Sequence, residues 1–128
     1  MSLNDYFANI EGIGILATSD EKGNVNLALY TAPHVVDENT VGFVMRDRLS
    51  HKNLQSNPNA AYMFIEQSEA YVGKRLYLSK IREEKNNSLI KTLKRQNPPI
   101  SPASLDDADK YLVYFRLERI RPLTGDKE

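Results

Sequence analysis

Alternation of apolar and polar side chains constrains the fold of this chain more than any other feature. In the segment VNLALYTA, residues 25–32, the large aliphatic side chains Val25, Leu27 and Leu29 occupy every second position. The segment KYLVYFRLERI, residues 110–120, alternates over a longer stretch. Successive side chains of a β-strand point to opposite faces of a sheet, so this period of two predicts strands rather than helices.

Shorter apolar runs, separated by turn residues, extend the same pattern along the chain. Residues 20–24, DEKGN, form a typical turn, with Gly23 available for a positive φ. The proline-rich stretch NPPISPAS predicts a loop before the last strand. Further strands are predicted in the segments IGILATS, HVVDENTVGFVM (two strands around a tight turn at 37–40), AAYMFIE and EAYVGKRLYLSKIREE.

Helical spacing occurs in three places. Leu3, Tyr6, Phe7 and Ile10 predict a first helix with Ser2 as its N-cap. Short helices are also expected over residues 50–57 and over residues 83–96. Few helices among about six antiparallel strands predict one domain, residues 1–128, built as a closed or nearly closed β-barrel.

Composition narrows the class of protein. Formal net charge is zero, so the whole chain has no electrostatic attraction to nucleic acid or membrane. Cysteine is absent, which excludes disulfides, thiolate catalysis and cysteine metal sites. The first ten residues, MSLNDYFANI, lack the basic and apolar regions of a signal peptide. We therefore expect a soluble, cytoplasmic protein.

Positive charge gathers where a predicted strand gives way to a predicted helix. The stretch VMRDRLSHKNLQSNP, residues 44–58, contains Arg46, Arg48, His51 and Lys52 within seven residues. Ser50 stands at the expected helix start, where its hydroxyl would cap the first turn. Free backbone N–H groups, the helix dipole and nearby cations together favour an anion, above all a phosphate. The alternative is a capped surface helix beside a solvated charged turn.

Other polar groups favour less specific interpretations. The two histidines, His34 and His51, lack metal-ligand spacing, so a metal site is not expected. Glu83 and Glu84 are interpreted as solvated helix ends. Residues 74–95 contain eight Lys or Arg against two Glu, which leaves nucleic-acid binding open as an alternative.

The order of these parts resembles a known family. The meander GILATSDEKGNVNLALYTAPHVVDENTVGFVM leads into RDRLSHKNLQSNPNAAYMFIE. This is similar to the FMN-binding split-barrel family, the pyridoxamine 5'-phosphate oxidase-like proteins. The resemblance covers residues 10–66 and extends to the last strand, YLVYFRLERIRPLTG, whereas residues 82–108 match nothing specific. Its motif residues here are Ser50, Lys52, Asn53, Leu54, Asn57 and Pro58.

The resemblance implies a six-stranded antiparallel split β-barrel with flanking helices, which forms a homodimer with flavin mononucleotide (FMN) at the interface. By position, Arg46, Ser50 and Lys52 would hold the FMN phosphate through their side chains, with His51 and Asn53 close by. The backbone N–H groups of His51 and Lys52 would complete the phosphate site. The isoalloxazine ring would lie against Tyr30, Thr31 and Ala32, and the ribityl chain against Val44, Met45 and Asp47.

Two differences from the family limit the activity expected. Arg46 stands where many relatives have Thr, and the Arg and His substrate motif of the true oxidases is not visible. The resemblance therefore implies an FMN-dependent oxidoreductase or electron carrier, with an unknown small-molecule substrate or redox partner, rather than a true pyridoxamine phosphate oxidase. Other family members bind a deazaflavin or haem. The alternative is a non-enzymatic binding module: a flavin store or sensor, or a nucleic-acid binder that uses residues 74–95.

Aromatic side chains in the later strands add an argument from the residues themselves. Tyr71, Tyr77, Tyr111, Tyr114 and Phe115 lie in strands whose neighbouring residues face opposite ways. One small barrel cannot bury them all, so some are expected to cover a partner subunit or a cofactor. This expectation agrees with a homodimer.

Overall fold

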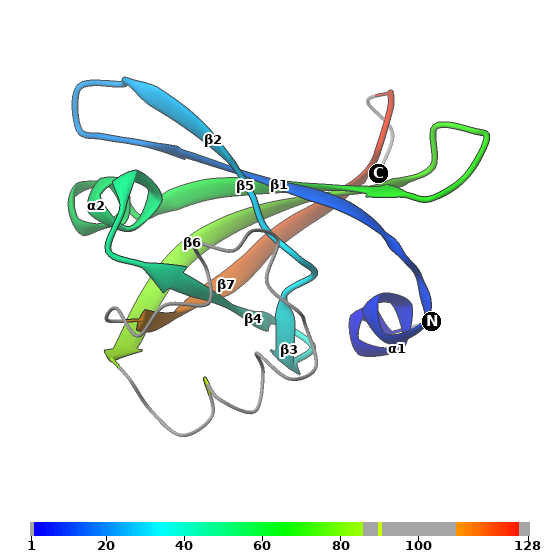
Figure 1. Ribbon diagram of the computed structural model, residues 1–128, viewed down its shortest axis with the longest axis horizontal. Coiled ribbons are helices and arrows are strands. Elements are labelled where there is room, and N and C mark those ends of the chain that lie inside the picture. Colours follow the sequence, from blue (N-terminus) through cyan, green and yellow to red (C-terminus); the bar gives the residue numbers. More distant parts are fainter. Residues whose placement is uncertain (1, 86–89, 91–109, 126–128) are drawn as a thin grey trace.

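Antiparallel strands dominate the computed structural model, which describes residues 2–85, 90 and 110–125 (Figure 1). Segments with alternating apolar and polar residues form strands because a strand can bury one of its faces. In the middle of the first strand, every second residue is buried. The elements in chain order are α1 (Leu3–Asn9), β1 (Gly12–Ser19), β2 (Val25–Leu29), β3 (His34–Asp37), β4 (Thr40–Arg46), α2 (Leu49–Ser56), β5 (Asn59–Glu66), β6 (Gly73–Lys85) and β7 (Lys110–Pro122).

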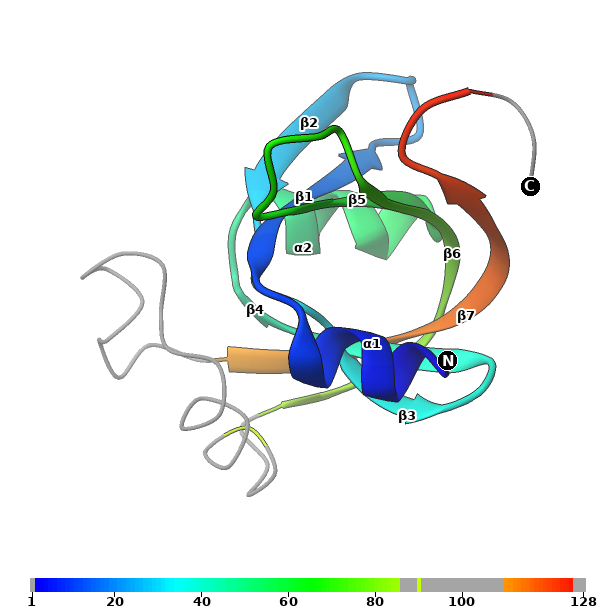
Figure 2. The same ribbon diagram turned by 90° about the vertical axis from the view of Figure 1, so that its right-hand side faces the viewer.

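The sheet has the order β2-β1-β5-β6-β7-β4-β3, and each pair of neighbours is antiparallel. It curls into a barrel, which Figure 2 shows nearly end-on. The predicted mainly-β, antiparallel class is thus confirmed. The described residues form seven strands rather than six, because the short β3 pairs with β4 and counts as a strand of its own.

The core fills the inside of this barrel with large side chains. Tyr62 and Phe115 are fully buried, and Phe43 lies against both rings at centroid distances of 4.9 and 5.8 Å. Such tilted and edge-on arrangements stabilise aromatic clusters beyond the area they bury. The remaining buried members of this cluster are Tyr6, Leu16, Val41, Met45, Leu54, Phe64, Leu76, Leu78 and Val113.

The two helices α1 and α2 lie toward opposite ends of the barrel (Figure 1). Helix α1 begins as predicted: the Ser2 hydroxyl accepts a hydrogen bond from the Asp5 N–H at 3.2 Å. The prediction of a helix over residues 83–96 was wrong at its start, because β6 continues to Lys85 and pairs with β7 there. Ile90 is helical and buried, and the rest of that predicted helix lies outside the described residues.

The outer face of β2, β1 and β5 is apolar as well. Val25, Leu27 and Leu29 are 81%, 71% and 56% exposed on one face of the edge strand β2. The strand register places Leu27 beside Ala17 and Leu29 beside Ile15, and Met63 follows on β5. A sheet with one solvated face ordinarily carries polar residues there, so this face is unusual for a monomer.

In the part of the chain that the structure describes, no helix has the length and apolar character needed to cross a membrane.

Candidate functional site

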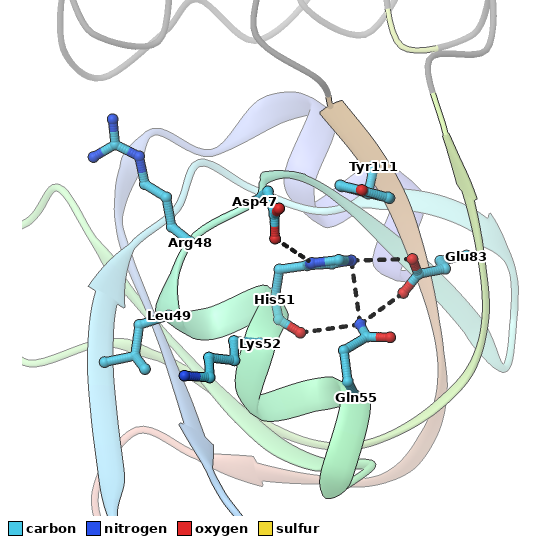
Figure 3. Close-up of a pocket in the computed structure, with 8 residues that line it drawn as sticks. All are labelled: Asp47, Arg48, Leu49, His51, Lys52, Gln55, Glu83 and Tyr111. Carbon is cyan, nitrogen blue, oxygen red and sulfur yellow. Dashed lines mark hydrogen bonds and ion pairs between the residues drawn. The ribbon is translucent and has the colours of Figure 1, made fainter.

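An open pocket of about 530 Å³ lies beside the N-terminal half of α2, near the C-terminal end of β6 and the start of β7 (Figure 3). Arg48, Leu49 and Lys52 lie on one side of the His51 ring, and Gln55 and Glu83 lie on the other. The residues that line the pocket are Asp47, Arg48, Leu49, His51, Lys52, Gln55, Glu83 and Tyr111.

The first turn of α2 is not capped by a side chain. Its N-cap is Arg48, which has extended backbone angles and makes no side-chain capping bond. The first intrahelical bond runs from the Lys52 N–H to the Arg48 carbonyl, at 2.9 Å. The N–H groups of Leu49, Ser50 and His51 precede that bond and have no acceptor within the helix. This turn therefore presents three backbone donors where the helix dipole is positive.

Two details of the predicted anion site are corrected by this geometry. Ser50 is not the N-cap, because the helix already begins at Leu49 and Ser50 lies inside its first turn. The Lys52 N–H is not available to a ligand, because it donates to Arg48. Of the two predicted backbone donors, only the His51 N–H is left without an acceptor in the helix, and the N–H groups of Leu49 and Ser50 join it.

His51 forms the centre of the pocket wall. Its ring is buried and stacks on Tyr111 with centroids 3.9 Å apart. Its Nδ1 lies 3.2 Å from Asp47 Oδ1, and its Nε2 lies 3.0 Å from Glu83 Oε2. One ring thus connects the end of β4, helix α2 and the end of β6.

The Glu83 carboxylate has three hydrogen-bond partners, which are Lys80, Gln55 and His51. Lys80 Nζ donates to its Oε1 at 2.6 Å, and Gln55 Nε2 donates to the same oxygen at 3.0 Å. Burial by itself raises the pKa of Glu83, but hydrogen bonds from Lys80, Gln55 and His51 outweigh it and lower the pKa to about 2. The carboxylate therefore stays ionised, and Lys80 offsets its charge.

Ser50 faces the barrel rather than the pocket. Its hydroxyl lies 3.4 Å from Asn26 Nδ2 and is near enough to the Tyr30 side chain to influence the pKa of its phenol. Burial raises the pKa of Tyr30, and the polar Ser50 hydroxyl and the charge of Arg48 partly offset that rise. The structure thus brings Tyr30 and Ser50 together, with the positive charge of Arg48 acting on the same phenol.

The segment after β2 is fixed from inside the barrel. The Tyr62 hydroxyl lies 3.2 Å from the Tyr30 carbonyl and 3.1 Å from the Thr31 carbonyl, and Tyr62 itself is fully buried. Gly14 makes this approach possible, since a Cβ there would lie 1.9 Å from the Tyr62 hydroxyl oxygen. Thr31 is exposed and Ala32 packs against the core.

The remaining predicted residues have mixed surroundings. Met45 is buried in the core, and Asn53 is buried with its amide donating to Thr18 Oγ1 at 3.1 Å. Val44 packs against a second, smaller buried cluster formed by Ile90, Leu112 and Tyr114. Arg46 is half-buried at the end of β4. Asp47, His51 and Lys52 line the pocket together. That these residues contact a cofactor stays a prediction.

Several lining residues were not singled out as site residues by the sequence. Glu83 was interpreted as a solvated helix end, yet its side chain is only 24% exposed and has three donors. Gln55 lies four residues after His51, a spacing that would have placed both on one helical face. Tyr111 is one of the aromatic residues of the later strands that one small barrel cannot bury together. No pattern of nearby residues in the sequence predicted its contact with His51.

Comparison of the sequence alone gives no assignment: no protein-family model matches it, and no curated protein does.

Solved structures do match the fold over nearly the whole chain. An F420 reductase is 16% identical, with a TM-score of 0.72 over 91% of this chain and 94% of that one. An FMN-binding protein from Syntrophomonas wolfei is 15% identical, with a TM-score of 0.70 over 89% of this chain and 78% of that one.

A candidate pyridoxamine 5'-phosphate oxidase from Lactobacillus delbrueckii is 14% identical, with a TM-score of 0.66 over 94% of this chain and 89% of that one. At such identities the likeness is one of fold. The chain is a split barrel of the kind found in pyridoxamine 5'-phosphate oxidase-like and FMN-binding proteins, so the resemblance noted in the sequence is confirmed at the level of fold.

Proposed function

We propose that the protein is a flavoprotein that binds FMN, with the phosphate at the first turn of α2. One observation carries this proposal: the uncapped turn opens onto the pocket beside Arg48 and Lys52. Backbone N–H groups at a helix N-terminus, with cations beside them, form a common phosphate site. The fold adds support, because a solved FMN-binding protein shares it.

The charges of the pocket fit a phosphate. Glu83 would repel an anion if its charge were unopposed, but Lys80 forms an ion pair with it, whereas the exposed Asp47 carboxylate lies against His51 Nδ1. Arg48 and Lys52 are exposed on the opposite side of His51 (Figure 3). The phosphate would therefore be held by the N–H groups of Leu49 to His51 together with the side chains of Arg48 and Lys52. Residues Tyr30 to Ala32 would face the isoalloxazine ring of FMN.

We infer that the activity is that of an oxidoreductase or electron carrier. A bound flavin supplies the hydride or electron chemistry, and the chain supplies binding, orientation and a controlled polarity around the ring. The alternative of nucleic-acid binding through residues 74–95 gains no support from the described part of that segment. Lys80 and Arg82 are both ion-paired there, with Glu83 and Glu84.

We also propose a homodimer that forms on the apolar outer face of β2, β1 and β5. Three large aliphatic side chains of β2 are more than half exposed there, and β2 is an edge strand. Burying such a face removes both an apolar patch and an unpaired edge from solvent. A second copy of the same chain would present the matching face in a symmetric contact.

The phosphate site is tested by titrating the protein with FMN and with riboflavin, which lacks the phosphate. A charge-assisted hydrogen bond is worth roughly 1.5 to 3 kcal/mol. Lys52→Ala should therefore weaken FMN binding by about one to two decades while riboflavin binding stays nearly unchanged. Lys22→Ala, in the exposed turn between β1 and β2, is the control and should change neither affinity.

Equal losses for both ligands, or no loss for either, would contradict the phosphate assignment. The absorbance spectrum of the purified protein gives an independent check on the cofactor. A flavin spectrum is expected. A colourless protein that also ignores added FMN would overturn the proposed function.

A further inference from the structure

Strand β6 extends past the barrel and brings Glu83 against α2. Both oxygens of this carboxylate are engaged: Oε1 by Lys80 and Gln55, and Oε2 by His51. Two of these three partners, His51 and Gln55, belong to α2 and lie one turn apart on the same face. A single carboxylate from a distant strand thus holds one face of the helix along a full turn.

The contact reaches the first turn of α2 directly. Gln55 Nε2 also donates to the His51 carbonyl at 3.0 Å, and His51 Nδ1 contacts Asp47, which immediately precedes the N-cap. The stack on Tyr111 fixes the plane of the His51 ring. Figure 3 shows the contacts of the His51 side chain with Asp47, Gln55 and Glu83. Rotation or displacement of α2 about its axis would break these contacts together.

We propose that Glu83 is a positioning residue for the anion site: through His51 and Gln55 it holds the first turn of α2 in the orientation that binds a phosphate. This inference rests on the proposed function, since it concerns the same site. It assigns to Glu83 a role that its own charge opposes, because a carboxylate beside an anion site weakens anion binding when it acts by charge alone.

Positioning and charge would change FMN affinity in opposite directions, so one substitution distinguishes between them. Glu83→Gln removes the negative charge and keeps the shape of the side chain. The one amide oxygen can still accept from Lys80 and Gln55, but the group that faces His51 Nε2 becomes an N–H donor and the charge that strengthened all three bonds is lost, so α2 is held less firmly. Positioning predicts that FMN affinity falls by about tenfold while riboflavin affinity stays nearly unchanged, whereas charge alone predicts that FMN affinity rises.

Glu84→Gln is the matched control. Glu84 is the next residue of β6 and pairs with Arg82 and the Tyr114 hydroxyl instead of α2. The substitution removes the same charge one residue away, and it should leave the ratio of FMN to riboflavin affinity unchanged. Gln55→Ala removes the Gln55 bond to Glu83 without a change in charge and should lower FMN affinity in the same direction as Glu83→Gln. It also replaces Glu83→Gln if that variant fails to fold.

Amide hydrogen exchange separates this proposal from the proposed function. The Lys52 N–H makes the first internal bond of α2, and its exchange is measured without any ligand. Faster exchange in Glu83→Gln, but not in Glu84→Gln, supports positioning even if the wild-type protein binds no FMN. Unchanged exchange, a rise in FMN affinity, or equal losses for FMN and riboflavin would each overturn it.

Discussion

Tyr62 shows how a single buried polar atom shapes the surroundings of the candidate site. Its hydroxyl lies within hydrogen-bond distance of two consecutive carbonyls, those of Tyr30 and Thr31, just before Pro33. Burial raises the pKa of Tyr62, so the hydroxyl keeps its proton and remains a donor. The path of the chain between β2 and β3 therefore depends on a residue of β5, far away in sequence.

Tyr62→Phe should destabilise the fold while leaving the core packing intact. Removing the donor leaves two inward carbonyls without it, which costs about 1 to 3 kcal/mol. Urea unfolding, followed by far-ultraviolet circular dichroism, measures the loss. Tyr77→Phe, on the outer face of β6, is a suitable control and should cost much less. An unchanged midpoint in Tyr62→Phe would show that the hydroxyl contributes nothing to this segment.

Glu83 predicts how stability depends on pH. Its pKa in the fold is lowered to about 2 from an ordinary 4.5, so its contribution is fully present above pH 4.5 and is lost as pH falls toward 2. The stability difference between wild type and Glu83→Gln should therefore be largest near neutral pH and shrink between about pH 4.5 and 2. Urea titrations of both proteins along this range measure it, and a pH-independent difference would contradict the assignment.

At the scale of elements, a buried polar pair attaches α2 to β1. Asn53 and Thr18 are 4% and 3% exposed, and the Asn53 amide donates to the Thr18 hydroxyl at 3.1 Å. Leu54, the next residue of α2, packs in the hydrophobic core. The helix is thus held to β1 on one face and to β6 on the other, and its first turn remains open between them.

A double-mutant cycle measures this attachment. Thr18→Val and Asn53→Leu keep approximate shape, and each alone leaves a buried polar group unpaired, at a cost of about 1 to 3 kcal/mol. Because the double variant leaves no polar group unpaired, it should cost less than the sum of the single variants by about 1 kcal/mol. Additive losses in chemical denaturation would show that the two side chains do not interact.

Local patterns predicted most elements, and contacts between distant segments decided the rest. The Ser2 cap and the alternation of β2 and β7 depend on nearby residues, so the sequence alone indicated them. Residues 83–85 have helix-forming side chains, but pairing with β7 overrides that propensity. The same pairing places Glu83 beside His51, so the sequence identified the basic turn but not the carboxylate that holds it.

For the whole molecule, the apolar outer face predicts self-association. Leu27→Lys places a charge at the centre of that face, where burial against a partner would be costly. The wild-type protein should sediment as a dimer at micromolar concentration, and the variant as a monomer. Val36→Lys, at an exposed apolar position on β3, is the control and should remain dimeric. Monomeric wild-type protein, with and without FMN, would refute the dimer.

The strand order also determines how the chain must fold. Hairpins such as β5–β6 form locally, but β1 must find β5, and β4 must find β7, with Phe43 opposite Val113. Closing such long loops costs entropy before any contact compensates for it, which places refolding on the order of milliseconds to seconds. On the ribosome, β4 has no partner on one edge until β7 has emerged. Closure of the barrel is therefore a late event of synthesis, and until then β4 exposes apolar side chains that invite chaperones or misassociation.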